Sequence, residues 1–354
     1  MRALVAMLLV AEAVGCARAP ADGVTTLTYA SPYSPLHPFS RADRVWMKWL
    51  EQEANGTLRI EPFWAGSLLS SEQSMTELRH GVADIGLITP IYARGGAHAT
   101  RMQAGFHAGL ATFAEQVALY RCLASHDQQL ARELDGLVVL AVQGGNLPGI
   151  VTRETPVSSL ADLQGLRLRA PAELLPILKH LGVDPVDMPM GEVYPALAKG
   201  VLDGVVAPAD TLKSLHFAEI ACCFNTLAIP RGAYAARAMS EQRWRTLSTE
   251  QRAVIERSPA IWERALAEEL ERASLAGQAA GREHGVQFTA MPTADVKRFL
   301  ELYDRHAERS AQDARQYGID GMKSYRYARK LAERAAAGGE ITCPEDEDGG
   351  SASR

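Results

Sequence analysis

Short runs in which apolar and polar residues alternate recur along the chain, and stretches with helical spacing separate them. Alternation is typical of half-buried strands, and a spacing of three to four residues is typical of amphipathic helices. Gly, Pro and Asn end most of these runs, as expected at turns and helix termini. The first elements predicted in this way are strands at residues 25–30, 58–64 and 85–88 and helices at residues 45–53 and 71–80.

The stretch from residue 165 to residue 220 has the most regular pattern. Three strand-like runs alternate there with two helical runs, which predicts a β-α-β-α-β unit with right-handed crossovers and a parallel sheet. The fold class is therefore α/β. The predicted strands are 166–169, 186–188 and 202–206, and the predicted helices are 172–181 and 192–199.

The remaining elements divide the chain into two lobes. Helices at residues 113–134 and a strand at 137–142 precede a turn-rich segment, 144–149, where we expect the chain to cross to a second lobe. We expect it to return around residues 230–232, so that two crossings form the hinge of a clamshell. A capping box at Ser248 predicts a helix to about residue 282, kinked at Pro259, and a strand at 286–289 and a helix at 293–317 follow.

Arg169 is the main candidate for ligand binding. It ends the strand at 166–169, and open α/β sheets bind ligands at the carboxyl ends of their strands. A guanidinium holds a carboxylate by two parallel hydrogen bonds, which lysine does not. A surface ion pair is the alternative role for Arg169. Arg167 lies mid-strand, which favours a structural or solvent-exposed role.

Three motifs in this stretch resemble those of the solute-binding proteins of TRAP transporters, the DctP type. They are DLQGLRLRAP at residues 162–171, MPMGEVYPAL at 188–197 and GVLDG at 200–204. The resemblance extends to ANGTLRIE at 54–61 and ELRHGVADIG at 77–86, and it covers residues 27–317.

The resemblance implies a periplasmic binding protein fold, a two-lobed clamshell with a long C-terminal helix packed along both lobes. It also implies a receptor that captures a small organic carboxylate and delivers it to the membrane permease subunits of a TRAP transporter. No cofactor, metal or catalysis is expected, and we expect a monomer. The predicted lobes comprise residues 24–146 with 232–275 and residues 147–231 with 276–334.

The resemblance also indicates candidate pocket residues. The end of the third strand contributes to ligand contact in the family, which corresponds to Thr89 and Tyr92, although core packing is an alternative for both. Tyr33 and His37 follow the first strand and are candidates for the pocket rim; a helix-entry or surface position is the alternative for His37. The full candidate set is Arg169, Tyr33, His37, Thr89, Tyr92, Asn146, Ala172, Met190, Ala207 and Arg231.

When the sequence is aligned with the family pattern, the predicted pocket contains few polar side chains. Met190, Ala172 and Ala207 stand where relatives carry aromatic or polar residues, and the second basic residue of the crossing segment is missing, unless Arg231 supplies that charge. A polyhydroxylated ligand would leave unpaired groups costing about 1–3 kcal/mol each. We therefore predict a monocarboxylate with an apolar or lightly polar body, rather than a sialic-acid-like sugar acid.

The two ends of the chain predict export and an unstructured tail. Residues 1–23 combine one early positive charge with a short apolar run, as in a signal peptide or lipoprotein leader. Ala13-Val14-Gly15-Cys16 resembles a lipobox, which would make Cys16 a lipidated N-terminus and would anchor the periplasmic protein to a membrane. The alternative is cleavage after Ala17-Arg18-Ala19 without a lipid. Residues 335–354 are acidic toward the end and predict a disordered tail.

Four cysteines follow Cys16: Cys122, Cys222, Cys223 and Cys343. We expect Cys222 and Cys223 not to pair with each other, because adjacent cysteines give strained geometry. A bridge from one of them to Cys122 and buried free thiols are the two alternatives, and free thiols are the simpler expectation.

The composition and the motifs that are missing argue against nucleic-acid binding and against enzymatic function. A net charge of −5 and the absence of basic blocks argue against a nucleic-acid partner. Hydrolase, zinc-peptidase and nucleotide-binding motifs are missing from the sequence, which argues against an exported enzyme. A binding protein that senses a ligand for a signalling partner is the alternative to an uptake receptor.

Overall fold

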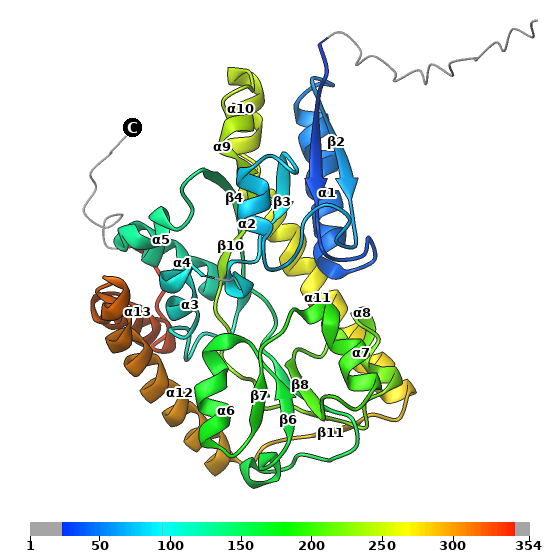
Figure 1. Cartoon of the computed structure of the whole chain (residues 1–354), viewed down its shortest axis with the longest axis vertical. Helices are drawn as coiled ribbons and strands as arrows, with labels where there is room; N and C mark the ends of the chain where they lie inside the picture. Colours follow the sequence, from blue (N-terminus) through cyan, green and yellow to red (C-terminus); the bar gives the residue numbers. More distant parts are fainter. Residues whose placement is uncertain (1–22, 94, 344–354) are drawn as a thin grey trace, which may run out of the picture.

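The computed structural model describes residues 23–93 and 95–343, which form two α/β lobes built on separate sheets (Figure 1). The first lobe contains a five-stranded sheet of order β2-β1-β3-β10-β4, and the second contains a six-stranded sheet of order β11-β9-β5-β8-β6-β7. The strands are β1 (Thr25–Ala30), β2 (Leu58–Phe63), β3 (Ile85–Leu87), β4 (Leu137–Gln143), β5 (Gly149–Thr152), β6 (Arg167–Arg169), β7 (Asp184–Val186), β8 (Gly204–Ala207), β9 (Cys223–Asn225), β10 (Tyr234–Ser240) and β11 (Gln287–Thr289).

The predicted β-α-β-α-β unit is confirmed. β6 lies between β7 and β8, and it is parallel to both. The middle strand lies two residues earlier than predicted and includes Pro185. Because β7 is at the edge of the sheet, a proline without an amide hydrogen is tolerated there.

Helices cover both sheets, and several differ in extent from the prediction. The α-helices are α1 (Pro38–Glu53), α2 (Ser74–Arg79), α3 (His98–Ala104), α4 (Phe113–His126), α5 (Gln128–Arg132), α6 (Leu175–His180), α7 (Val193–Ala198), α8 (Thr211–Ser214), α9 (Glu241–Trp244), α10 (Thr249–Glu256), α11 (Pro259–Glu283), α12 (Thr293–Asp313) and α13 (Gly321–Ala336). The 3₁₀ helices are η1 (Pro90–Tyr92), η2 (Leu160–Leu163), η3 (Ala172–Leu174), η4 (Met190–Glu192), η5 (Phe217–Glu219) and η6 (Ala314–Tyr317).

Two of these differences have a clear cause at the helix start. α1 begins at Pro38, seven residues before the predicted start, because the His37 side chain caps it by accepting the Phe39 amide at 3.2 Å. Pro259 does not kink one long helix: α10 ends at Glu256, and Pro259 opens α11. Proline fits the first helical position because the amide hydrogen it lacks has no partner there.

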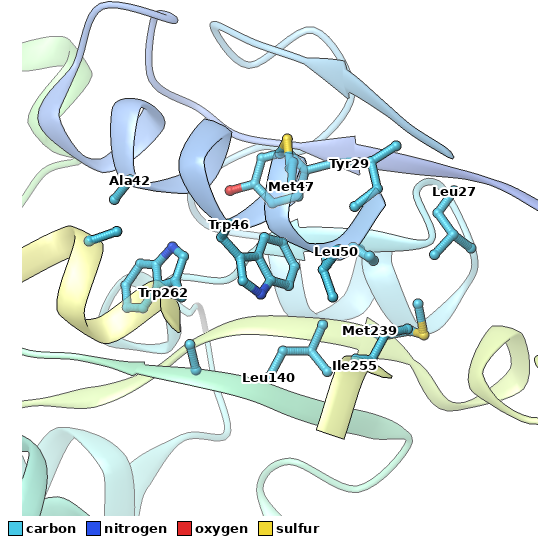
Figure 2. Packing of buried hydrophobic residues seen from close by; sticks show 14 of the residues in the cluster. Leu27, Tyr29, Ala42, Trp46, Met47, Leu50, Leu140, Met239, Ile255 and Trp262 are labelled. Atoms are coloured by element: carbon cyan, nitrogen blue, oxygen red, sulfur yellow. The ribbon is translucent and has the colours of Figure 1, made fainter. Parts of the chain in front are cut away.

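The helix α11 runs along both lobes, as the predicted fold requires (Figure 1). Its first half buries Trp262 in the core of the first lobe, near Trp46 of α1 (Figure 2). In its second half, a Cβ at Gly277 would lie 2.1 Å from the Ala209 carbonyl oxygen, so only glycine permits this approach to the start of α8. The two-lobed periplasmic binding protein fold with a long C-terminal helix is thus confirmed.

The C-terminal helices return to the first lobe. α13 was not predicted, and it packs with α12 against α3 and α4 (Figure 1). A disulfide joins Cys343 to Cys122 of α4, and a second joins Cys222 to Cys223. The expectation of free thiols was therefore wrong, and Cys122 bonds to Cys343 rather than to Cys222 or Cys223, because the fold brings the C-terminal segment onto α4. The expectation that Cys222 and Cys223 do not pair was wrong as well.

The same segment corrects the predicted tail. Residues 335 and 336 belong to α13, and residue 343 is held by its disulfide, so the disordered tail predicted from residue 335 is wrong for residues 335–343. The rest of that tail, 344–354, and the leader with Cys16 lie outside the described residues. Within residues 23–93 and 95–343, no helix combines the length and the apolar character needed to cross a membrane.

The two crossings between the lobes lie side by side. The Ile229 amide donates to the Pro148 carbonyl at 2.8 Å, which joins the outgoing and returning segments. Gln116 of α4 fixes the outgoing segment by two hydrogen bonds to the Gly145 backbone, of 2.8 and 3.1 Å. These bonds position the base of the cavity described next.

Candidate ligand-binding site

A cavity of about 100 Å³ lies between the lobes, against the crossing segments. Six of the predicted binding residues line it: Tyr33, His37, Tyr92, Arg169, Met190 and Arg231. The other lining residues, mostly apolar, are Phe39, Ile91, Ala104, Pro148, Pro171, Glu173, Leu174, Val206, Pro208, Asp210, Thr211, Leu215, Pro230, Gly232, Tyr234 and Leu270.

Arg169 enters the cavity from the carboxyl end of β6, and its residue is only 2% exposed. Its Nε donates to the Met188 carbonyl at 2.9 Å, and its Nη2 donates to the Tyr92 hydroxyl at 2.7 Å. Both acceptors are neutral, and among the described residues no carboxylate lies within 4.0 Å of the guanidinium. A buried positive charge without a carboxylate is a candidate site for an anionic ligand.

Arg169 and Tyr92 join the two lobes across the cavity. Tyr92 belongs to η1 of the first lobe, while Arg169 belongs to the second. The guanidinium carbon also lies 5.7 Å from the centre of the Tyr92 ring, within reach of a cation–π contact. The anion site is therefore assembled from both lobes.

Aromatic rings form the first-lobe wall. Tyr33 and His37 stack with their ring centres 4.1 Å apart, and Phe39 meets both edge-on. Burial lowers the pKa of His37 to about 3, so the imidazole is neutral at physiological pH. Burial also raises the pKa of Tyr33. This wall is uncharged, and it suits an apolar or aromatic ligand body.

Two acidic groups in the cavity were not predicted. Burial raises the pKa of Glu173 and of Asp210, and this effect outweighs the lowering by Arg169 or Arg231 nearby. Asp210 is 4% exposed and follows β8. The rule that ligands bind beyond the carboxyl ends of strands would have found Asp210, had the segment after residue 207 been searched.

A buried network of the first lobe reaches the cavity through Tyr234. The Tyr234 hydroxyl accepts a 3.0 Å hydrogen bond from Gln143, whose carbonyl oxygen accepts from Arg237 at 3.2 Å. Arg237 forms a forked pair with Asp43, at 2.7 and 3.2 Å. Burial raises the pKa of Tyr234 to about 12, so its hydroxyl stays protonated.

Four predicted residues do not line this cavity. The Thr89 hydroxyl turns away and donates to the Ser71 carbonyl. Ala207 is buried in the second-lobe core, since strand alternation turns Val206 toward the cavity instead. Ala172 lines a separate cavity, and its neighbour Glu173 borders both.

The fourth, Asn146, lies behind the cavity wall. Its Nδ2 donates to the Leu270 carbonyl of α11 at 3.0 Å and to Oδ1 of Asp210 at 3.3 Å. Asn146 therefore positions Asp210.

Comparison with known proteins places these features in a family. Residues 29–313 match the model of the bacterial extracellular solute-binding proteins, family 7 (DctP). A solute-binding protein of Albidiferax ferrireducens is 26% identical over 182 residues, which are 50% of this chain and 52% of that protein. A monocarboxylate 2-oxoacid-binding periplasmic protein of Nostoc sp. is 28% identical over 170 residues, 47% of this chain and 46% of that protein. The chain thus spans about half the length of the curated relatives it matches.

Solved structures share the fold over nearly the whole chain. A TRAP solute-binding protein from Rhodoferax ferrireducens, in complex with copurified benzoate, has a TM-score of 0.81 at 23% identity and covers 89% of this chain and 99% of its own. Another from Bordetella bronchiseptica, with bound (R)- and (S)-mandelate, has a TM-score of 0.77 at 18% identity and covers 88% and 99%. The family match covers most of the chain and is one of binding proteins rather than enzymes, so this protein belongs to the bacterial extracellular solute-binding proteins of family 7, the TRAP periplasmic type.

Proposed function

We propose that this protein captures a monocarboxylate with an apolar or aromatic body and delivers it to the membrane permease of a TRAP transporter. The ligand carboxylate binds the Arg169 guanidinium, and the ligand body lies against the aromatic wall of Tyr33, His37 and Phe39. Arg169 carries the proposal, because it is buried beside neutral partners and has no carboxylate within 4.0 Å among the described residues.

The cavity lining supports an apolar body. Most lining residues are apolar or aromatic, and they include Ile91, Leu174, Met190 and Leu270. A sugar acid would bury several hydroxyl groups against these side chains, at a cost of about 1–3 kcal/mol for each hydroxyl left unpaired.

The relatives support the same ligand class. Proteins of this fold are known with benzoate, 3-hydroxybenzoate and mandelate, all of which are aromatic monocarboxylates. Others of the fold hold galacturonate or glucuronate, so the fold alone does not decide the body of the ligand. The lining of this cavity favours the first group.

Delivery requires export and a change of shape on binding. A ligand that contacts both lobes stabilises the closed arrangement, which a permease then recognises. We propose that the divisions at 24–146 with 232–275 and at 147–231 with 276–334 are the two moving lobes, except that α13 moves with the first lobe, because it packs against α3 and α4. We also propose a periplasmic location, with Cys16 as a lipid anchor.

A thermal-shift screen tests the carboxylate site. Benzoate, mandelate, a 2-oxoacid, galacturonate and sialic acid are each added to the wild type, Arg169→Ala and Arg167→Ala. A ligand at 100 times its dissociation constant stabilises the folded state by about 2.7 kcal/mol. Arg167 is the matched control, since it is on the same strand but exposed, in a pair with Asp184.

The expected result is a shift with an aromatic or apolar acid in the wild type and in Arg167→Ala, and none in Arg169→Ala. An equal shift in all three proteins would show that Arg169 is structural. A response to the sugar acids alone would overturn the assignment of an apolar ligand body.

A further inference from the structure

The cavity contains a second pair of charged groups, separate from Arg169. Asp210 follows β8 of the second lobe, and Arg231 lies on the returning crossing segment. Both side chains line the same cavity, and Arg231 lowers the pKa of Asp210 against the larger raising effect of burial. Asp210 and Arg231 differ from Arg169 in position, because Arg169 extends from the end of β6 and Arg231 lies on the crossing segment next to Gly145.

Both groups are fixed from behind and open toward the cavity. Asn146 donates to Oδ1 of Asp210 at 3.3 Å, and the same amide is held by α11. The Arg231 guanidinium packs on Gly145, where a Cβ would lie 2.5 Å from its central carbon. Gln116 in turn holds Gly145 by two hydrogen bonds.

Asp210 and Arg231 are not joined to each other. Within the described part of the chain, neither takes part in an ion pair of 4.0 Å or less, although both line the same cavity. Asp210 is 4% exposed, so solvent does not compensate its carboxyl group. A ligand atom between them would therefore contact a buried acceptor and a guanidinium donor together.

We propose that Asp210 and Arg231 form a second polar subsite that binds a hydroxyl group of the ligand, so that this protein takes hydroxy-substituted monocarboxylates. This inference rests on the proposed function. It adds to the Arg169 site a second point of recognition, at the hinge end of the cavity.

A hydroxyl group fits this pair better than other substituents. It donates one hydrogen bond to Asp210 and accepts one from Arg231. A second carboxylate would be attracted by Arg231 but repelled by Asp210. An ammonium group would be attracted by Asp210 but repelled by Arg231, so neither group matches both residues. An apolar end would leave Asp210 buried without a ligand partner.

The other titratable groups of the cavity do not change the preference of the subsite for a hydroxyl group. Glu173 enters from η3, and Arg169 and Arg231 both lower its pKa against the larger raising effect of burial. Tyr234 from β10 is neutral because burial raises its pKa to about 12. His37 is neutral as well, since burial lowers its pKa to about 3. Arg231 is thus the cation placed to act with Asp210.

Calorimetric titration with pairs of acids that differ by one hydroxyl group tests the subsite. The pairs are phenylacetate with mandelate and benzoate with 3-hydroxybenzoate, and isophthalate tests for a second carboxylate. The proteins are the wild type, Asp210→Ala, Arg231→Gln and Met190→Leu. Met190→Leu is the control, because it alters the shape of the same cavity without removing a polar group.

We expect the hydroxylated member of at least one pair to bind the wild type about 10- to 100-fold more tightly. Asp210→Ala and Arg231→Gln should reduce that ratio toward one, while Met190→Leu should leave it unchanged. The affinity for the member without the hydroxyl should fall far less in the two subsite variants.

Three results would overturn the subsite. They are equal binding within both pairs, a ratio that persists in both subsite variants, or tightest binding of isophthalate. The first two leave the carboxylate site of Arg169 intact, provided that the acids still bind. Binding of no acid at all would instead overturn the proposed function together with this inference.

Discussion

The two buried arginines of this protein differ in what surrounds their charge. Arg237, in the first-lobe core, has no solvent exposure and forms a forked pair with Asp43, at 2.7 and 3.2 Å. Its guanidinium also lies 4.5 Å from the centre of the Trp262 ring. Arg169 is buried to nearly the same extent, but its protein partners are a carbonyl and a hydroxyl group.

The difference separates a structural arginine from a binding arginine. Asp43 neutralises Arg237 within the protein and itself accepts hydrogen bonds from Tyr29 and Trp262, at 2.6 and 2.7 Å. No ligand is needed to complete that site. Arg169 keeps its charge available, and a ligand carboxylate would complete its coordination as Asp43 completes that of Arg237.

The largest effect is expected from breaking the complete pair. Asp43→Asn leaves the Arg237 charge buried without a carboxylate, which should lower the free energy of unfolding by about 3–5 kcal/mol. Urea denaturation followed by circular dichroism measures this change. The control is Glu241→Gln, which removes an exposed pair with Arg245 and should change the free energy of unfolding by less than about 1 kcal/mol. Similar losses in both variants would contradict the structural role of the Asp43 pair.

The second prediction concerns the incomplete site. Arg169→Ala should lower the affinity for the carboxylate ligand by about 2–5 kcal/mol, because the ligand charge loses its partner. The free energy of unfolding without ligand should change by less than about 1 kcal/mol, since the variant removes a buried charge along with two hydrogen bonds to neutral groups. Calorimetry and urea denaturation measure the two quantities. A loss of stability as large as that of Asp43→Asn would make the two arginines equivalent.

The third prediction uses the unpaired acid of the cavity. Because burial raises the pKa of Asp210 above its unfolded value, its contribution to stability is present below about pH 4 and is lost as pH rises through the raised pKa. Each unit of difference in pKa changes the free energy of unfolding by about 1.4 kcal/mol. The wild type should therefore lose stability relative to Asp210→Asn as pH rises from 4 to 7, because asparagine does not titrate. Parallel profiles from denaturation at several pH values would contradict this.

The smallest effect is expected at the contact between the lobes. Tyr92→Phe removes the hydroxyl that accepts from Arg169 at 2.7 Å but keeps the ring. One such hydrogen bond contributes about 0.5–1.5 kcal/mol, and we expect a weaker affinity for the carboxylate by about that amount. Ile91→Val is a control in the same wall, without a hydrogen bond. An unchanged affinity in Tyr92→Phe would show that Tyr92 does not orient the guanidinium in the bound state.

The sequence allowed much of the fold to be predicted, because the pattern around Arg169 contains strong local signals. Alternation at 166–169 and glycines at the helix ends identify the parallel unit, and the capping box at Ser248 marks the start of α10. The Cys122–Cys343 bond was missed because it joins segments far apart in the chain, and such contacts leave no short-range pattern. Helix α13 was missed although its sequence carries local signals: Asp320 caps its start, and its buried residues recur at helical spacing.

The site was less accessible to prediction. Arg169 and Tyr33 were found because they lie at the ends of strands, and Tyr92 was found through the family resemblance. Ala207 was also chosen by aligned position, but it lies on the opposite side of its strand. Asp210 follows β8, so its place at a strand end was predictable, but no local pattern marks its burial. Its position depends on Asn146, which is 64 residues away along the chain.

The bond between Cys122 and Cys343 closes residues 122–343 into a covalent ring that contains every strand of the second lobe. One cut of the backbone anywhere in that ring leaves a single molecule, because the two new ends remain joined through the sulfur atoms. A protease that nicks an exposed loop there would thus release a lobe only after reduction. Electrophoresis with and without a reductant would display the difference as one band against two.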